Sequence, residues 1–174
     1  IRYRDLVAGR QRVLWLVVSL LIAIVPGISA SAQWREWLLF RFGGDFGTKD
    51  PQFSTDIGFY VFKLPFLTTA IDWLFGFLLV TTLAVAVVHY LNGAIRVQPL
   101  GERVSPNAKA HLSVLLATAA FTKAVDYWLQ RFELVTSPGA SFDGAGYTDV
   151  NASLPAIQLM VLISVFAGVA LLVN

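Results

Sequence analysis

The stretch LPFLTTAIDWLFGFLLVTTLAVAVVHYLNGAI, residues 64–95, contains a single charged side chain, that of Asp72. A transmembrane helix needs about 20 predominantly apolar residues to cross a bilayer. At a rise of about 1.5 Å per residue, residues 64–95 would form a helix roughly 48 Å long, which exceeds a hydrocarbon core of about 30 Å. We therefore predict a membrane-spanning helix that either tilts or begins in the headgroup region.

Three further stretches are long and almost free of charge. Residues 13–34 and 150–174 carry no charged side chain, and residues 110–130 carry only Lys123 and Asp126. Across the chain, 56% of residues are hydrophobic and 14% are charged, whereas soluble domains carry about 25% charged residues. This composition places the chain in a lipid bilayer.

The predicted fold is therefore an all-α, polytopic transmembrane helical bundle with four spans and an interfacial helix. It forms one membrane module, residues 1–174, and we expect this module to be a fragment of a longer chain. The approximate boundaries are 13–33, 65–91, 109–131 and 153–173 for the spans, 34–64 and 132–152 for the outer loops, and 92–108 for the inner loop.

Basic residues predict the orientation of the spans, because cytoplasmic loops are enriched in Lys and Arg. The segments before the first span and between the second and third spans are basic, whereas the other two connections contain seven acidic and five basic residues. The basic residues of the first two segments are Arg2, Arg4, Arg10, Arg12, Arg96, Arg103 and Lys109. We expect a multi-pass protein of the cell (plasma) membrane, with both ends of this fragment in the cytoplasm.

A cleavable signal peptide is an alternative for the first span. Arg10 and Arg12 precede an apolar core, and Ala30-Ser31-Ala32 offers the small residues of a cleavage site. The length of the apolar segment and the three spans that follow favour an uncleaved helix.

Aromatic residues are concentrated near the predicted outer ends of the spans. The segment QWREWLLFRF, residues 33–42, mixes Trp34, Trp37 and Phe42 with charged side chains, which is typical of a helix in the headgroup region. Trp128, in the third span, is a further predicted interfacial residue. These side chains would fix the depth of the helices in the membrane.

The rest of the first outer connection has two interpretations. Asp50-Pro51 pairs an N-cap residue with the residue preferred at the first helical position, so a short helix could begin there. The alternation of Ile57, Phe59 and Val61 also suits an extended strand. The sequence leaves both structures open.

Three charges within the spans form a candidate site. Asp72 lies nine residues after Lys63, roughly 13 Å deep, and Lys123 lies eight residues before Arg131, roughly 12 Å deep. Asp126 shares the helix face of Lys123, because residues three apart are neighbours on a helix. A charge exposed to lipid costs about 2.5–3.5 kcal/mol. We therefore predict a charge cluster of Asp72, Lys123 and Asp126, which acts either as a structural clamp between helices or as part of an ion or proton pathway.

Several kinds of site are not supported by the sequence. The absence of cysteine excludes disulfides and thiolate metal sites. No H-E-x-x-H, G-x-S-x-G or P-loop motif occurs, and no polybasic tract indicates a nucleic-acid partner. We expect no enzyme activity, no cofactor and no nucleic acid.

Metal binding is not expected either. The oxygen-bearing side chains of Asp143, Asp149 and Asn151 lack the spacing of an EF-hand. His89 and His111 lie near the inner ends of the second and third spans and could approach one another, but zinc sites use three or four protein ligands. Anchoring at the interface is the favoured role of the two histidines.

Three segments together carry a family resemblance. They are FGTKDPQFSTDIGFYVFKLPF (46–66), HYLNGAIR (89–96) and GAGYTDVNASLPA (144–156). The chain resembles bacterial membrane proteins of uncharacterised protein family 0182. The resemblance implies several amino-terminal spans followed by a large extracytoplasmic region, and it brings no catalytic residues. The family-like positions in the predicted outer loops are Asp50, Pro51, Asp56, Phe59, Tyr60, Gly146, Tyr147 and Asp149.

The expected function is that of a membrane anchor or scaffold module that positions extracytoplasmic protein, with the charge cluster as a clamp. The alternative is a subunit of an ion-coupled or lipid transporter or channel. The expected partners are the lipid bilayer and either the remainder of the protein's own chain or other membrane subunits, and oligomers can form.

Overall fold

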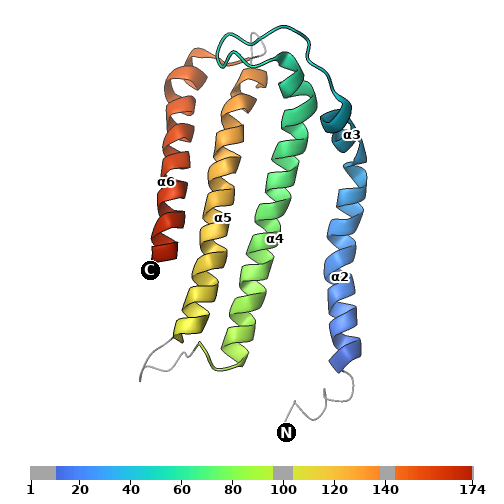
Figure 1. The fold of residues 1–174 in the computed structure, drawn as a ribbon, viewed down its shortest axis with the longest axis vertical. Coiled ribbons are helices and arrows are strands. Elements are labelled where there is room, and N and C mark those ends of the chain that lie inside the picture. The colour runs from blue at the N-terminus through green and yellow to red at the C-terminus, as the bar shows by residue number, and fades with distance from the viewer. Residues whose placement is uncertain (1–10, 96–103, 138–143, 174) are drawn as a thin grey trace. The chain divides into compact units, whose positions relative to one another are not determined.

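The computed structural model describes residues 11–95, 104–137 and 144–173, apart from the side chains of residues 11, 12, 14, 15, 18, 21, 22 and 25. The described residues form helices and contain no β-strand. The α-helices are α2 (Gln11–Ala32), α3 (Trp34–Phe42), α4 (Leu64–Leu91), α5 (Pro106–Glu133) and α6 (Leu154–Val173) (Figure 1). The prediction of an all-α chain is confirmed. Parts of the predicted inner and outer loops, 96–103 and 138–143, lie outside the described residues, as do Arg2, Arg4 and Arg10.

The chain divides into two compact units, 1–43 and 44–174. The first unit contains α2, which includes Pro26, and the nine-residue helix α3. The helix predicted over residues 33–42 is confirmed by α3, in which Trp34, Trp37 and Phe42 are all exposed. Its position in the headgroup region stays a prediction.

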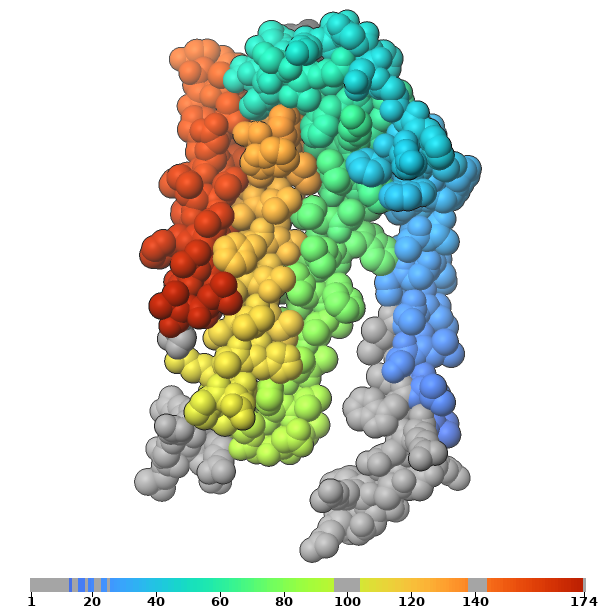
Figure 2. Space-filling model, in the orientation of Figure 1, coloured from blue at the N-terminus to red at the C-terminus, as the bar shows by residue number. Residues whose placement is uncertain are grey.

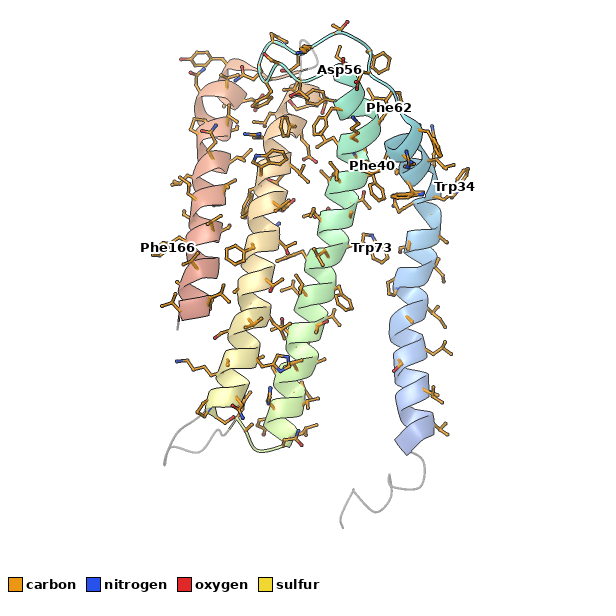
Figure 3. The ribbon with its side chains drawn as sticks, viewed as in Figure 1. Trp34, Phe40, Asp56, Phe62, Trp73 and Phe166 are labelled. Atoms are coloured by element: carbon orange, nitrogen blue, oxygen red, sulfur yellow. The ribbon has the colours of Figure 1, made fainter. Side chains whose placement is uncertain are left out.

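The second unit is a row of three helices with α5 in the middle. Helix α5 packs against α4 on one side and α6 on the other (Figure 1), and its side chains fill the space between them (Figure 2). The buried residues of α5 include Ala117, Ala119 and Ala124, and small side chains of this kind let neighbouring helices approach closely. In contrast, Phe166 projects from α6 on the side away from α5 (Figure 3).

Three helical segments among the described residues are long and apolar enough to cross a membrane. They are Phe59–Leu91, Pro106–Thr136 and Asp149–Val173, and they correspond to the second, third and fourth predicted spans. Helix α2 is not among them, since many of its side chains lie outside the described residues. Of the four predicted spans, three are thus helices long and apolar enough to cross a membrane.

Two of these segments begin with a wider, π-helical turn. Phe59–Lys63 precedes Leu64-Pro65, and Asp149–Ser153 precedes Leu154-Pro155. Proline has no N–H group, and its ring collides with the carbonyl four residues earlier in an α-helix. The Leu64 N–H instead donates to the Phe59 carbonyl, five residues back, and the turn widens to accommodate the proline.

The two interpretations of the segment after Asp50 were both wrong. Residues 51–53 form a turn rather than the start of a helix, and residues 59–63 form the π-helical turn rather than a strand. Lys49 and Asp56 are joined by an isolated antiparallel bridge. Of the three alternating residues, Phe59 packs against the buried cluster, whereas Ile57 and Val61 are exposed. Period alone does not separate the start of a helix from a short strand.

Close packing between α5 and α6 depends on Gly168. A Cβ atom on Gly168 would lie 2.7 Å from the nearest ring carbon of Phe121, on α5, whereas a Cβ atom on Gly76, in α4, would meet no described atom within 4 Å. We predict that Gly168→Leu lowers the free energy of unfolding in detergent by about 1–3 kcal/mol, because the larger side chain forces the helices apart. Gly76→Leu is the matched control, and equal losses in the two variants would contradict the packing.

Candidate functional site

The end of the second unit at which α4 and α6 begin carries most of the family-like residues. We call residues 44–63 and 144–153 the cap. Within it, Gln52 and Phe53 lie beside Ala145, Asp149 and Val150. Two loops that are far apart in the sequence therefore form one structure over the helix ends.

Asp50 organises the first loop of the cap. Its carboxylate accepts hydrogen bonds from the N–H groups of Gln52, Phe53 and Thr55, at 2.8, 2.8 and 3.0 Å. The Tyr60 hydroxyl donates a fourth bond at 2.8 Å. Because Asp50 is only 5% exposed, this buried charge depends on these donors for its solvation.

The hydrogen bonds also determine the protonation of Asp50. Burial raises the pKa of the carboxyl group, but the bonds from Phe53, Tyr60, Thr55 and Gln52 together outweigh burial and hold the pKa below its usual range. Asp50 is therefore a carboxylate at neutral pH. Since its pKa is lower in the folded state, its contribution to stability is present above the unfolded-state pKa and is lost as the pH falls through the folded-state value.

Aromatic side chains connect Asp50 to α5. Tyr60 and Phe132 are buried in one cluster, against which Phe53 and Phe59 pack. The ring of Phe132 meets those of Phe53 and Phe59 edge to face, at centroid distances of 5.0 and 5.1 Å. Such pairs add stability beyond the area they bury. The loop is thus attached both to the start of α4 and to the end of α5.

Arg131 completes this cluster. Its guanidinium carbon lies 4.5 Å from the ring centroid of Phe132, 4.6 Å from that of Trp128 and 5.6 Å from that of Phe53. Cation–π contacts of this kind hold an arginine against aromatic faces. Trp128, which the sequence suggested as an interfacial residue, is 42% exposed and also holds this arginine.

Asp56 and Asp149 shape the remainder of the cap. The Asp56 carboxylate accepts bonds from the N–H groups of Phe46, Gly47 and Gly58, at 2.9, 2.9 and 2.7 Å. The bonds from Phe46 and Gly58, followed by that from Gly47 and the nearby charge of Lys63, lower the pKa of Asp56. The Asp149 carboxylate accepts bonds from Gly146 N–H and the Ser153 hydroxyl. Each carboxylate fixes backbone where the chain enters a spanning segment.

Of the family-like residues, Pro51 and Tyr147 have a different setting. Pro51 lies in the turn that Asp50 closes, and its side chain is exposed. Tyr147 is 85% exposed, so its ring stands free of the cap. Neither residue contributes to the buried network.

Only two of the three residues of the predicted charge cluster form an ion pair in the structure. Lys123 forms an ion pair with Asp126 within α5, and Gln130 Nε2 donates to the same carboxylate at 3.1 Å. Asp126 is buried. Lys123 reaches α4 through Phe75, with its Nζ atom 5.1 Å from the ring centroid. The contact between α4 and α5 at this depth is therefore a cation–π contact.

Asp72 makes no hydrogen bond or ion pair with any described residue. Its charge is near enough to act electrostatically on Lys123, but the two groups are not paired directly. The sequence placed the two residues at one depth and could not fix their rotation about the helix axes. A functional role for the cluster stays a prediction.

At the opposite end of the second unit, the two histidines meet as expected. His89 Nε2 lies 3.4 Å from His111 Nδ1, with the rings at 90°. The His89 carbonyl accepts bonds from the N–H groups of Ala94 and Ile95, which close the end of α4. Among the described residues, no group of three or more His, Cys, Asp or Glu side chains could hold a metal ion.

Comparison with known proteins adds the family. The model of an uncharacterised protein family, UPF0182, matches residues 1–174. The chain belongs to this family. A UPF0182 protein of Salinispora arenicola is 44% identical over an alignment of 174 residues that covers 99% of this chain. UPF0182 proteins of Nocardioides sp. and Mycobacterium avium are 43% and 41% identical over 99% and 97% of this chain.

This UPF0182 chain matches only part of each relative. It spans 18% of the Salinispora protein and 17% of the Nocardioides and Mycobacterium proteins. No solved structure matches the chain. The names of these relatives state no activity.

The hydrogen bond between Tyr60 and Asp50 gives a direct test of the cap. We predict that Tyr60→Phe lowers the free energy of unfolding by about 1–3 kcal/mol, because it removes one donor from a buried carboxylate. Tyr147→Phe removes an exposed hydroxyl and is the matched control. Chemical unfolding in a fixed detergent measures both variants. A Tyr60→Phe variant as stable as the control would show that the bond does not stabilise the cap.

Proposed function

We propose that this chain is a membrane anchor and scaffold module whose cap supports extracytoplasmic protein. The observation that carries the proposal is the buried Asp50 network, which joins the cap to both α4 and α5. A loop held by backbone hydrogen bonds and aromatic packing offers a rigid base, whereas a loop without them would move independently of the helices.

The length of the relatives supports this function. The chain spans less than one fifth of the curated relatives it matches. A protein with most of its mass elsewhere needs a segment that fixes it at the membrane, and three spans provide this. The proposed partners are the bilayer and the remainder of the chain or other membrane subunits. We propose neither an enzyme activity nor a nucleic-acid partner for this module.

The proposal includes a fourth span and an orientation. Helix α2 has 22 residues, and residues 13–32 carry no charge, which suits a membrane crossing. With the basic segments inside, the cap faces outward, both ends of this fragment are cytoplasmic and the location is the cell membrane. An outward cap is where an extracytoplasmic region would attach.

Ion-coupled or lipid transport is the second candidate. It is favoured by one observation, the burial of the charged Asp126 within a spanning segment. Intramembrane charges often mark ion or proton pathways. The pairing of Asp126 with Lys123 in the same helix equally suits a structural role, so the two functions need separate measurements.

The anchor function requires the cap to face outward. The chain contains no cysteine, so single cysteines can be introduced without background from this segment. We predict that Asn151→Cys reacts with a membrane-impermeant thiol reagent on intact cells and that Asn107→Cys does not. Both side chains are exposed in the structure, which makes them a matched pair. The reverse pattern would invert the orientation and exclude an outward cap.

Two measurements on the full-length protein distinguish the anchor function from the transport function. If the cap is a support, Tyr60→Phe should make the extracytoplasmic region several-fold more sensitive to external protease, while Tyr147→Phe and Asp126→Asn leave it unchanged. Liposomes containing the protein should show no proton or cation flux above empty liposomes. A flux that Asp126→Asn abolishes, together with an unchanged protease pattern in Tyr60→Phe, would replace the anchor with the transport function.

A further inference from the structure

Neither the cap nor the Lys123–Asp126 ion pair gives a role to Asp72. It lies in the spanning segment Phe59–Leu91, nine residues after Lys63 and so roughly 13 Å along the helix. Its side chain is exposed and has no hydrogen bond or ion pair among the described residues. A carboxylate exposed at this depth is unfavourable in lipid unless another group neutralises it.

A polar stripe on α5 accompanies Asp72. Lys123, Asp126, Gln130 and Glu133 follow one another at intervals of three or four residues, so they share one face of the helix. The side chains of Lys123, Asp126 and Gln130 are already bonded to one another. Lys123 Nζ lies 5.1 Å from the ring centroid of Phe75 on α4. Phe75 is three residues after Asp72 and shares its side of the helix, so Asp72 lies near the stripe.

The charges of the stripe on α5, taken together with Asp72 on α4, are unbalanced. Asp72, Asp126 and Glu133 supply three carboxylates against the single ammonium of Lys123. Lys123 is paired with Asp126, whereas Asp72 and Glu133 are exposed and without an ion pair in the described part of the chain. The face therefore complements a cationic side chain.

Two of the other helices, α2 after Arg12 and α6, offer no such cation, whereas α3 holds Arg35 and Arg41 in the separate unit 1–43. Residues 13–32 of α2 and all of α6, residues 154–173, contain no charged side chain. The curated relatives are more than five times longer than the segment they share with this chain, which is 17–18% of their length. The remaining four-fifths of such a protein has room for further helices.

We propose that the face of α4 around Asp72 docks against a membrane-spanning helix from the part of the full-length protein outside residues 1–174, and that this helix places a lysine or arginine beside Asp72. The contact pairs the exposed carboxylate and extends the row α4–α5–α6 by one helix. This inference does not depend on the anchor function, because a transporter would need the same neutralisation.

Photocrosslinking in the full-length protein tests the occupant of this face. A benzophenone amino acid replaces Asp72, and in a matched variant it replaces Leu74, which is exposed on a different side of α4. We expect the probe at 72 to crosslink within the same polypeptide, to an apolar segment that contains a lysine or arginine and lies outside residues 1–174. Mass spectrometry identifies the segment, and the probe at 74 should not give the same product.

A charge exchange then tests the pairing itself. We expect Asp72→Arg to reduce the yield of folded full-length protein more than Asp72→Asn does, because the new arginine would face the lysine or arginine of the docked helix. Exchanging the basic residue of the crosslinked segment for aspartate should restore the yield of Asp72→Arg. Crosslinks only to lipid, to residues 1–43 or to a second copy would overturn the proposal, as would the absence of any product or of restoration by the exchange.

Discussion

The buried carboxylate of Asp50 is the constraint on which the cap depends. An ionised group that is only 5% exposed requires hydrogen bonds in place of water, and it obtains them from three backbone N–H groups and one hydroxyl. Two of these donors lie within the turn that starts at Pro51, one lies just after it, and the hydroxyl of Tyr60 lies at the beginning of the α4 segment. Satisfying one charge therefore fixes the path of the chain into the α4 segment, and the aromatic cluster around Phe132 connects this loop to α5.

The three spanning segments differ in what they contribute. Helix α5 packs on two sides and carries the Lys123–Asp126 ion pair and several buried alanines. Many apolar side chains of α4 and α6 are exposed. A bilayer offers no hydrophobic driving force between helices, so close packing such as that of Phe121 against Gly168 must hold them together. The cap adds order at one end, and the contact between His89 and His111 joins α4 and α5 at the other.

Much of the fold could be predicted from the sequence because apolar length is a strong signal. The runs that contain Asp72, Lys123 and Ala156 all form helices long and apolar enough to cross a membrane, and α3 formed where its aromatic residues indicated. The site was harder to predict. The sequence did not show that Asp50 would be buried and Asp72 exposed, because local pattern does not report rotation about a helix or the approach of distant loops. The contact of Arg131 with Phe53 gave no local signal either, since Phe53 lies far from it in the sequence.

The cap depends on an ordered Asp50 turn in a lipid bilayer. Hydrogen exchange of the backbone N–H groups of Gln52, Phe53 and Thr55, measured in lipid nanodiscs, reports this order directly, because all three donate to the Asp50 carboxylate. We predict slow exchange in the unaltered protein and much faster exchange at these three positions in Asp50→Ala. Fast exchange in the unaltered protein, at the rate of the Asp50→Ala variant, would contradict a cap held by this carboxylate.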